Sequence, residues 1–243
     1  MGNRAKYRPV GDSALTMVFG DAIDPVVNAR VLAMAQAVEQ ARLPGVGEVC
    51  PAYASLLVQY DPLTVDYRAL VRLLKRLERA PGAGTAPAPR RLELPVLYGG
   101  PGGPDLGHVA GHTGLSPAEV IALHSGRDYP IYMIGFLPGF PYLGGMDGRL
   151  ATPRLATPRV RIPPGSVGIA GGQTGVYPLP SPGGWQLVGR TPVRLYDPAR
   201  PEPVPFRAGD FIRFVAVDEG RYDEIEEKVA REGWFPPPEE VAP

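Results

Sequence analysis

The stretch IPPGSVGIAGGQTGVYPLPSPGGWQLVGRTP, residues 162–192, decides the fold of the second part of the chain. Its β-prone pieces, Ser166–Ala170 and Trp185–Val188, are short and are separated by glycine and proline residues that favour turns. The segments Val193–Tyr196 and Asp210–Val217 continue this pattern of short strands. Many short strands joined by such turns are typical of a β-barrel, so we expect a mainly β domain here.

Helices are expected beside these strands. The sequence SPAE at residues 116–119 has the capping-box pattern with proline at the first helical position, which predicts a helix that ends at Gly126. Asp105 is expected to cap a short helix that runs to about Gly111. The other expected elements of this part are strands over Arg91–Tyr98 and Ile131–Phe136 and a terminal helix over Arg221–Glu232.

The first third of the chain alternates patterns of strand and helix. Asp24 is a good N-cap for a helix over Pro25–Arg42, and Val65–Arg79 has the leucine spacing of a second amphipathic helix. Strands are expected over Ala14–Phe19 and within Glu48–Tyr60. This order predicts a small α+β sandwich of the β-α-β-α type.

The segment APGAGTAPAP, Ala80–Pro89, separates these two parts. It has no apolar periodicity and consists of residues that are flexible or favour an extended polyproline conformation. We therefore expect a small α+β domain over residues 1–85, followed by a β-barrel domain with a C-terminal helix over residues 86–243.

Composition excludes several classes of function. The 243 residues carry 25 basic and 25 acidic side chains, so no net charge attracts nucleic acid or an acidic membrane surface. Cys50 is the only cysteine, which excludes an intramolecular disulfide and a thiolate metal cluster. The N-terminal sequence lacks the apolar core of a signal peptide, and no apolar run reaches membrane-spanning length, so a cytoplasmic location is expected.

The sequence lacks the common catalytic motifs: it has no G-x-x-x-x-G-K-[ST] phosphate loop, no G-x-S-x-G nucleophile elbow and no H-E-x-x-H zinc motif. His108 and His112 are spaced to share one helix face, but glycines weaken that helix and no glutamate lies between them. We interpret them as surface histidines and expect no metal site. His124 lies in the last turn of its helix, where the dipole is expected to raise its pKa modestly and the ring to bond a backbone carbonyl.

Aromatic side chains cluster in the loop GFLPGFPYLGGMD, residues 135–147. Phe136, Phe140 and Tyr142 stand on a backbone stiffened by proline and shaped by glycine. Such rings either plug a core or form the wall of a site for a planar ligand, and composition alone slightly favours the core.

The stretch from Ser166 to Trp185 combines glycines with polar side chains and follows three arginines. Glycine lets a backbone N–H approach an anion closely, and a guanidinium can hold carboxylate or phosphate oxygens in pairs. The residues concerned are Arg154, Arg159, Arg161, Ser166, Gly171, Gly172, Gln173, Thr174, Tyr177, Ser181, Gly183, Gly184 and Trp185. The pattern fits an anion site about as well as it fits β-turns on a barrel rim with solvated arginines.

The arginines belong to a doublet, LATPR at Leu150–Arg154 and LATPR again at Leu155–Arg159. In an extended strand, side chains five residues apart point to opposite faces. If both guanidiniums serve one site, the chain must therefore bend near residues 155–157. Of the two, Arg159 is expected to enter the groove, because it lies closer to the glycine-rich stretch.

Together these motifs resemble the KipI family, which includes the B-type subunit of 5-oxoprolinase and is also described as the first subunit of allophanate hydrolase. The resemblance rests on LHSGRDYPIYMIGFLPGFPYLGGMD at residues 123–147, on the two Pro-Arg pairs, on IPPGSVGIAGGQTGVYP at residues 162–178 and on SPGGWQLVGRTP at residues 181–192. It implies a small α+β domain followed by a cyclophilin-like β-barrel.

The resemblance also implies an activity and partners. Family members act with a KipA-like C-type partner and a LamB/YcsF-like A-type partner to open 5-oxoproline to glutamate, with ATP used by the complex and no cofactor evident in this chain alone. Two alternatives remain open: inhibition of a sensor histidine kinase, and a role in a urea- or allophanate-processing enzyme. Neither nucleic acid nor a membrane is an expected partner.

For a lactam substrate, the resemblance implies a binding site at the matching motifs. Phe136, Phe140 and Tyr142 would wall the ring, and Arg154 and Arg159 would hold carboxylate or phosphoryl oxygens. The remaining candidates for contact with the substrate are His124, Ser166, Gln173, Thr174, Tyr177, Gly183, Gly184 and Trp185, and no catalytic residue is assigned.

Overall fold

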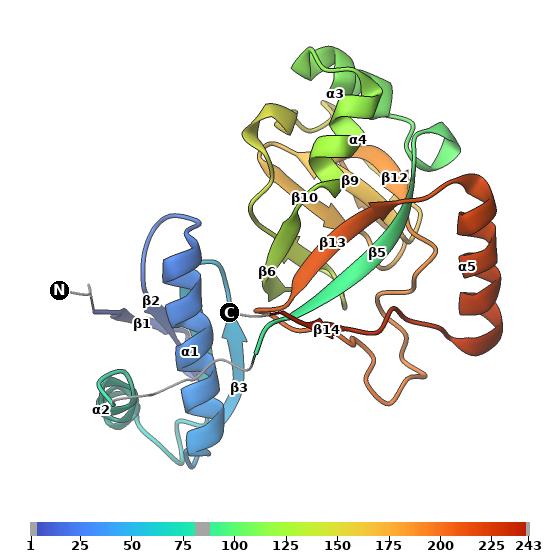
Figure 1. The fold of residues 1–243 in the computed structure, drawn as a ribbon. Helices are drawn as coiled ribbons and strands as arrows, with labels where there is room; N and C mark the ends of the chain where they lie inside the picture. Colours follow the sequence, from blue (N-terminus) through green and yellow to red (C-terminus); the bar gives the residue numbers. More distant parts are fainter. Residues whose placement is uncertain (1–3, 81–87, 242–243) are drawn as a thin grey trace. The chain divides into compact units, whose positions relative to one another are not determined.

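The computed structural model describes residues 4–80 and 88–241, and the chain divides by its contacts into two compact units, Met1–Ala88 and Pro89–Pro243 (Figure 1). The domain boundary expected between residues 85 and 86, and most of the expected linker, lie outside the described residues.

The N-terminal unit is a four-stranded antiparallel sheet with two helices. The sheet order is β1-β2-β4-β3. Its elements are β1 (Lys6–Val10), β2 (Ala14–Val18), α1 (Pro25–Ala41), β3 (Val46–Pro51), β4 (Ser55–Tyr60) and α2 (Tyr67–Leu77). Met17 pairs with Leu56 and Leu15 with Val58, and all four side chains are fully buried, so alternate residues of β2 and β4 face the helices.

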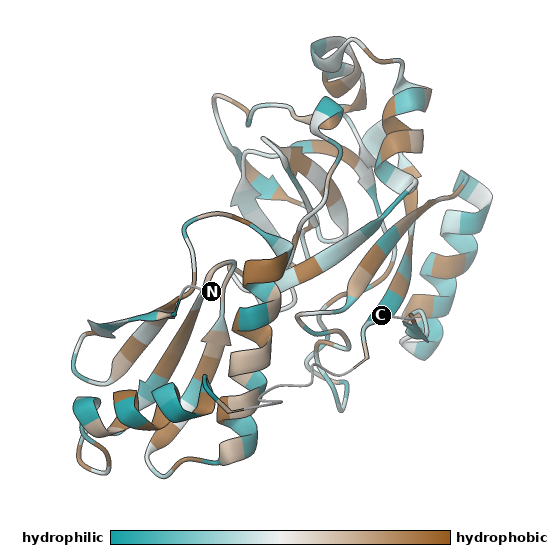
Figure 2. Ribbon diagram, turned by 60° about the vertical axis from the view of Figure 1, so that its left-hand side comes forward, coloured by the Kyte–Doolittle hydropathy of each residue, from teal (hydrophilic) through white to brown (hydrophobic). Residues whose placement is uncertain are grey.

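Side-chain caps start both helices of this unit. The Asp24 carboxylate accepts a hydrogen bond from Val27 N at 2.9 Å, as expected, and Asp66 accepts one from Ala69 N at 2.9 Å. Because Asp66 serves as the cap, α2 begins two residues later than the leucine pattern alone predicts. The apolar faces of both helices then pack over the sheet, and Figure 2 shows brown apolar and teal polar residues alternating along these helices.

The predicted β-α-β-α order is wrong, because the unit has the order β-β-α-β-β-α. The strand β1 is not predicted from the sequence, because KYRPV is short, contains a proline and is almost entirely exposed, with only Tyr7 packed against the core. The segment expected to hold one strand up to Tyr60 contains the hairpin β3–β4.

The C-terminal unit is built around a nearly closed β-barrel. The strand order is β10-β9-β12-β5-β13-β6-β7, with β14 beside β5, and β10 lies against β7 so that the sheet nearly closes on itself. These strands are β5 (Arg90–Tyr98), β6 (Asp128–Ile134), β7 (Pro141–Leu143), β9 (Ser166–Ala170), β10 (Gln173–Val176), β12 (Gln186–Arg190), β13 (Phe211–Ala216) and β14 (Glu239–Glu240). A separate ladder joins β8 (Arg159–Ile162) to β11 (Ser181–Gly183).

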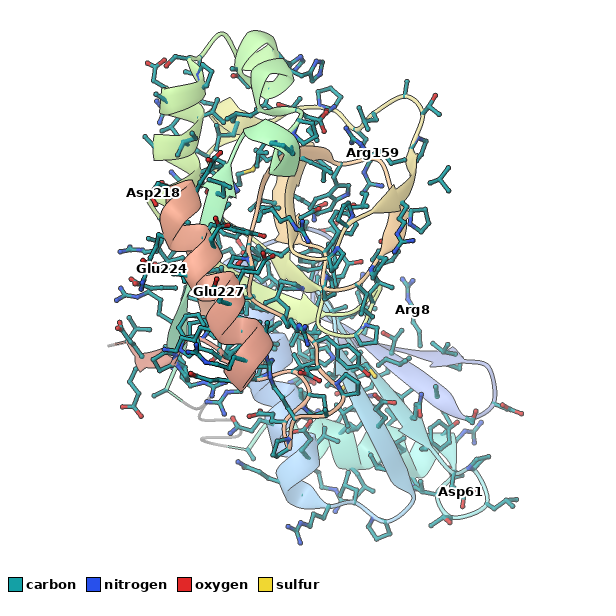
Figure 3. All side chains as sticks on the ribbon, turned by 90° about the vertical axis from the view of Figure 1, so that its right-hand side faces the viewer. Arg8, Asp61, Arg159, Asp218, Glu224 and Glu227 are labelled. Atoms are coloured by element: carbon teal, nitrogen blue, oxygen red, sulfur yellow. The ribbon has the colours of Figure 1, made fainter. Side chains whose placement is uncertain are left out.

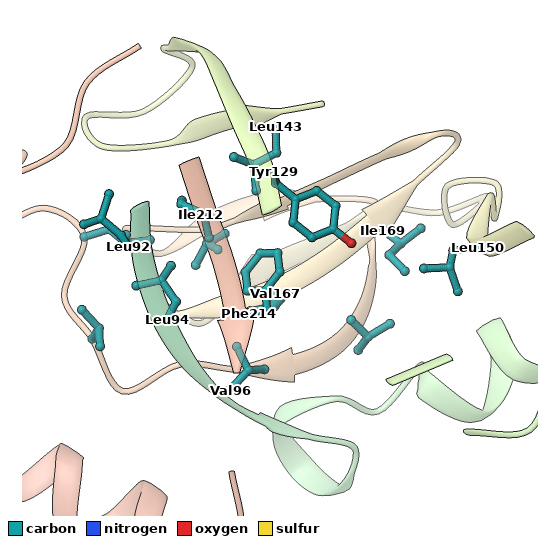
Figure 4. Close-up of a cluster of buried hydrophobic side chains, with 14 of the residues drawn as sticks. Leu92, Leu94, Val96, Tyr129, Leu143, Leu150, Val167, Ile169, Ile212 and Phe214 are labelled. Carbon is teal, nitrogen blue, oxygen red and sulfur yellow. The ribbon is translucent and has the colours of Figure 1, made fainter. Parts of the chain in front are cut away.

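One hydrophobic core fills the barrel (Figure 4). Tyr129 of β6 and Phe214 of β13 lie at its centre with ring centroids 5.4 Å apart, surrounded by aliphatic side chains of the neighbouring strands. The ion pair of Arg90 with the buried Asp210, at 2.6 Å, ties the start of β5 to the turn that precedes β13. The expected fold class, an α+β unit followed by a mainly β-barrel, is confirmed.

Three helices accompany the barrel: α3 (Leu106–Thr113), α4 (Pro117–Ser125) and α5 (Glu219–Glu232). The predicted capping box is present, because Ser116 Oγ accepts from Glu119 N and Glu119 Oε2 accepts from Ser116 N at 2.8 Å. Figure 3 looks onto α5 and labels Asp218, its N-cap, and the exposed Glu224 and Glu227. Short 3-10 turns cover Gly100–Gly102 and Gly148–Leu150.

One expected strand is absent from the structure. Residues 193–196 have no strand pairing, although Val193 and Leu195 bury their side chains in the barrel core. The alternation of apolar residues in this segment therefore reflects burial of two side chains and not backbone pairing with a neighbouring strand. Among residues 4–80 and 88–241, no helix combines the length and apolar character needed to cross a bilayer.

Candidate functional site

Five aromatic rings gather on the face of the β9–β10–β12 sheet that points away from the barrel core. We call Phe136, Phe140, Tyr142, Tyr177 and Trp185 the aromatic cluster. Phe140 is its centre, with ring centroids 5.1 to 5.7 Å from those of the other four rings and interplanar angles of 60 to 86°. Edge-to-face pairs of this kind add stability beyond the burial of apolar area.

The glycines of the signature sequence make room for these rings. A Cβ atom at Gly175 would lie 3.1 Å from the Trp185 ring and 3.2 Å from the Phe140 ring, and one at Gly183 would lie 2.6 Å from the Tyr177 hydroxyl. Gly171 and Gly184 are expected to offer free backbone N–H groups to an anion. This is wrong at Gly171, whose N–H donates to Thr152 O at 2.7 Å. Gly184 is buried and is therefore not exposed to a ligand as expected.

Phe136 is the exposed member of the cluster. Its side chain is 63% exposed and its φ is +63°, a left-handed conformation that is rare for a bulky residue. The loop holds it there through two short turns, because Leu137 N donates to Gly135 O at 2.7 Å and Phe140 N donates to Leu137 O at 3.0 Å. Strained backbone of this kind costs about 1–3 kcal/mol and is concentrated at functional sites.

Arg159 is a structural brace. Its Nη2 atom lies 2.7 and 2.8 Å from the two carboxylate oxygens of Asp105, and its Nη1 donates to Trp185 O at 3.2 Å. The expectation that Arg159 enters a groove is therefore not met. Asp105 occupies the expected N-cap position of α3, but its side chain makes no cap bond and instead accepts from Leu187 N at 2.6 Å.

Arg154 is the arginine that stays available. Its guanidinium carbon lies 6.0 Å from the Trp185 ring centroid, the side chain is exposed, and within the described residues it forms no ion pair or hydrogen bond. The chain bends at residues 156–157, and Leu155 N donates to Gly184 O at 2.7 Å. Burial raises the pKa of Tyr177 to about 12, while the charges of Arg154 and Arg159 oppose that rise.

His124 lies inside the barrel, away from the cluster. It is fully buried, and burial lowers its pKa to about 3, so the expected rise in pKa is wrong. Its ring bonds two hydroxyls instead of a carbonyl: Tyr98 Oη at 2.7 Å from Nδ1 and Thr174 Oγ1 at 2.8 Å from Nε2. Burial disfavours the protonated imidazole more than the helix dipole favours it, and no carboxylate among the described residues contacts the ring to stabilise its charge.

The direction of these hydrogen bonds fixes the tautomer of His124. Thr174 Oγ1 donates to Gly168 O at 3.0 Å, so it accepts from Nε2–H of the imidazole. Nδ1 is then the acceptor for the Tyr98 hydroxyl. With His124 neutral and its proton on Nε2, each hydrogen bond in the series from Tyr98 through His124 and Thr174 to Gly168 O has one donor and one acceptor.

The structure brings together only some of the candidates. Around the cluster lie Phe136, Phe140, Arg154, Arg159, Tyr177, Gly183, Gly184 and Trp185. Ser166 and Gln173 share the cluster's face of the β9–β10 hairpin by strand alternation, with Ser166 buried, whereas Thr174 and His124 point to the barrel interior. His108 and His112 lie exposed on one face of α3, as expected, with ring centroids 6.4 Å apart.

Two supporting residues escaped the sequence analysis. Asp105 forms an ion pair with Arg159, which is 54 residues away in the sequence. Gln186 Nε2 donates a hydrogen bond to Pro153 O at 2.8 Å and so fixes the backbone next to Arg154. Neither contact leaves a local sequence signal. Within the described residues, no three His, Cys, Asp or Glu side chains are grouped as metal ligands.

Comparison with known proteins identifies the family. The family model "Carboxyltransferase domain, subdomain C and D" matches residues 5–206. The chain is 46% identical over 235 residues to a Bacillus subtilis protein named as the B subunit of 5-oxoprolinase, covering 93% of this chain and 98% of that one. A protein of the same name from Escherichia coli O157:H7 is 43% identical over 218 residues, covering 89% and 98%.

Solved structures agree with this assignment. The protein TTHA0988 superposes with a TM-score of 0.76 at 41% identity, over 84% of this chain, which spans about 40% of that longer chain. Urea carboxylase of Kluyveromyces lactis, at 20% identity, shares the fold with a TM-score of 0.77 over 98% of this chain and 24% of its own. The chain therefore belongs to the carboxyltransferase-domain family of subdomains C and D, in the group of B-type subunits of 5-oxoprolinase.

Proposed function

We propose that this chain is the B-type subunit of an ATP-dependent 5-oxoprolinase, which opens 5-oxo-L-proline to L-glutamate together with an A-type and a C-type subunit. The observation that carries the proposal is the 46% identity, over 98% of its length, to a relative named for that role. Relatives named for urea chemistry are 25% identical, so the urea- or allophanate-processing alternative has less support.

The chemistry requires activation of a stable amide. Transfer of the γ-phosphoryl group of ATP to the lactam carbonyl oxygen leaves ADP and makes the carbonyl carbon electrophilic. Water then adds to that carbon, the C–N bond breaks and the ring nitrogen takes a proton, which leaves an acyl phosphate. A second water hydrolyses the acyl phosphate to glutamate and inorganic phosphate. We assign ATP use to the assembled complex.

The aromatic cluster supplies features that suit this substrate. Phe136 offers exposed ring surface for a small planar lactam, and Arg154, which is unpaired within the described residues, is a cation over the ring of the buried Trp185. A guanidinium in this position holds the substrate carboxylate through paired hydrogen bonds. Arg159 and Asp105 fix the backbone of Trp185 and Leu187, and therefore keep the site in shape without contacting substrate.

An exposed aromatic side chain on a strained loop also suits a surface that is covered by another chain. In the complex, Phe136 would be buried by the partner, and the site would be completed by residues of both chains. The partner that we propose for this face is the KipA-like C-type subunit. The further member of the complex is the LamB/YcsF-like A-type subunit. A cytoplasmic location remains a prediction.

The test is reconstitution. The purified chain is mixed with the A-type and C-type subunits of the same organism, 5-oxoproline and ATP, and glutamate and ADP are measured over time. Glutamate formation that requires all three subunits supports the proposal. If the mixture lacking this chain forms glutamate at the same rate, the proposal is wrong.

A further inference from the structure

A cavity of about 390 Å³ lies in the N-terminal unit, between the start of β1 and one side of α2 with the two residues that follow the helix. Its wall includes the rings of Tyr7 and Tyr67 and three basic side chains, those of Arg4, Lys75 and Arg79. The volume is within the range of small-molecule sites. No residue of the aromatic cluster belongs to this unit, so the cavity and the proposed substrate site share no residue.

Three basic residues and one acidic residue line this cavity, so its positive charge is only partly neutralised. Within the described residues, none of Arg4, Lys75 and Arg79 forms an ion pair. The single carboxylate of the wall, that of Glu78, is already engaged, because it accepts from Ala5 N at 2.8 Å and from the Tyr7 hydroxyl at 2.9 Å.

The helix dipole accounts for only part of this arrangement. Basic residues in the last turn of α2 compensate the partial negative charge of its carbonyl groups. Arg4, however, comes from the opposite end of the unit in sequence, and its presence in the same wall has no such explanation. Arg76, in the same turn of α2, does not line the cavity and therefore provides a comparison outside its wall.

Lys75 is held against an aromatic surface. Its Nζ atom lies 5.4 Å from the centroid of the Tyr7 ring, and the Tyr7 hydroxyl is fixed by Glu78. The cavity therefore combines an oriented ammonium group and two guanidiniums with two rings. Several cations that converge from different segments match the oxygens of a multiply charged phosphate group better than the two oxygens of a carboxylate.

We propose that this cavity binds a phosphorylated small molecule, with its phosphate oxygens held by Lys75, Arg79 and Arg4 and its organic part against Tyr7 and Tyr67. The ligand chemistry is that of a di- or triphosphate, which a nucleotide or a free polyphosphate supplies. The proposal does not depend on 5-oxoprolinase activity, because it concerns the other unit and its test measures binding.

The lysine content of the chain allows a direct test on the unmodified sequence. Lysine occurs only at Lys6, Lys75 and Lys228, so mass spectrometry reads the acetylation rate of each separately. The probes are ATP, tripolyphosphate and adenosine at equal ionic strength. A phosphate ligand at ten times its dissociation constant slows modification of Lys75 about tenfold. Lys228 is the internal control, because its Nζ lies 5.0 Å from the Trp234 ring in a comparable setting outside the cavity.

Protection of Lys75 by ATP or by tripolyphosphate, without protection of Lys228, supports the site, and the more effective of the two identifies the source of the phosphate. Adenosine alone is expected to leave Lys75 unchanged. An unchanged rate at Lys75 with both phosphate probes at millimolar concentration overturns the proposal, and so does equal protection by adenosine.

A matched pair of variants adds a second readout. Arg79→Gln removes one cation of the cavity wall, and Arg76→Gln removes a cation from the same turn outside it. Loss of one charge-assisted contact is expected to weaken phosphate binding about tenfold in Arg79→Gln, measured by calorimetric titration. Equal affinities of the two variants for the effective probe would argue that general surface charge, not the cavity, attracts the anion, and would overturn the proposal.

Discussion

Arg159 forms an ion pair with Asp105, and its Nη2 atom lies 2.7 and 2.8 Å from the two carboxylate oxygens. The same carboxylate accepts from Leu187 N at 2.6 Å, and the same guanidinium donates to Trp185 O. The pair thus joins the residue before α3 to β8 and to both ends of the Trp185–Leu187 segment, which contributes Trp185 to the aromatic cluster. Arg159 is labelled in Figure 3.

Breaking this pair is expected to destabilise the barrel. In Asp105→Ala, the Leu187 N–H loses its acceptor and the partly buried Arg159 loses its counter-charge. A cost of about 2 kcal/mol in the free energy of unfolding is expected, less than for a fully buried pair because Arg159 remains 28% exposed. Urea denaturation followed by tryptophan fluorescence measures it.

The control for this experiment is Arg149→Ala. Arg149 also pairs with a carboxylate, that of Asp147 at 2.7 Å, but its side chain is 64% exposed. Its urea midpoint is expected to match that of the unsubstituted chain. A midpoint for Asp105→Ala that also stays unchanged would mean that the Asp105–Arg159 bridge does not hold the segment.

Local signals in the sequence predicted the elements with local causes. The caps at Asp24 and Ser116 were readable because the capping side chain and its N–H partner lie within three residues of each other. The exposed strand β1 gives only a weak signal, because it pairs with β2 through the backbone and Tyr7 is its one side chain packed against the core.

The candidate site was predictable as a set of motifs but not as an arrangement. Proximity to the glycine-rich stretch favours Arg159 over Arg154 for the groove, whereas the position of Asp105 in the folded chain makes Arg159 the brace and leaves Arg154 as the available cation. His124 looked like an exposed helix end, yet the barrel closes over it, so burial sets its pKa. Contacts between distant segments decide both outcomes, and no single-sequence pattern encodes them.

The left-handed backbone of Phe136 leads to an unusual order of stabilities. Alanine at this position keeps the unfavourable φ, whereas glycine adopts it without strain. Both variants lose the same ring contact with Phe140. Phe136→Gly is therefore expected to be more stable than Phe136→Ala by about 1 kcal/mol, the reverse of the usual order at ordinary backbone positions. Thermal denaturation of the two variants gives the sign, and a more stable alanine variant would rule out strain in this loop.

The glycines that face the aromatic cluster are expected to differ sharply in tolerance. In Gly183→Ala, the new methyl group would lie 2.6 Å from the Tyr177 hydroxyl and 2.7 Å from Ile162 Cδ1, so the ring must move. Overpacking of this kind costs about 1–3 kcal/mol. At Gly172 no atom lies within 4 Å of the added methyl group, so Gly172→Ala is the control. A red-shifted Trp185 emission together with a lower melting temperature is expected for Gly183→Ala alone.

The buried histidine predicts a pH dependence of stability with a definite sign. Burial lowers the pKa of His124 to about 3, whereas an unfolded chain has a histidine pKa near 6.5. Above that value the imidazole is neutral in both states. As the pH falls below it, only the unfolded state takes up the proton, and about 2 kcal/mol of stability is lost by pH 5.

The variant His124→Gln tests this dependence. Its amide can still bond the hydroxyls of Tyr98 and Thr174, but it has no proton to take up in this range. The unfolding free energy of the variant is expected to change less between pH 7 and pH 5 than that of the unsubstituted chain. His108→Gln, at an exposed position, is expected to keep the original slope. An unchanged slope in His124→Gln would assign the pH dependence to other groups.

Arg154 offers the sharpest test of the aromatic cluster as a substrate site, because the chain provides a matched control seven residues away. Arg154 and Arg161 are both exposed and, within residues 88–241, neither forms an ion pair, but only Arg154 lies over Trp185. Both alanine variants are expected to melt at the temperature of the unsubstituted chain. In the reconstituted complex, Arg154→Ala is expected to raise the KM for 5-oxoproline by about tenfold or more, as loss of a charge-assisted contact predicts. Arg161→Ala is expected to keep the original KM. Equal kinetics of the two variants would remove Arg154 from the substrate site and leave its contact with Trp185 as a structural one.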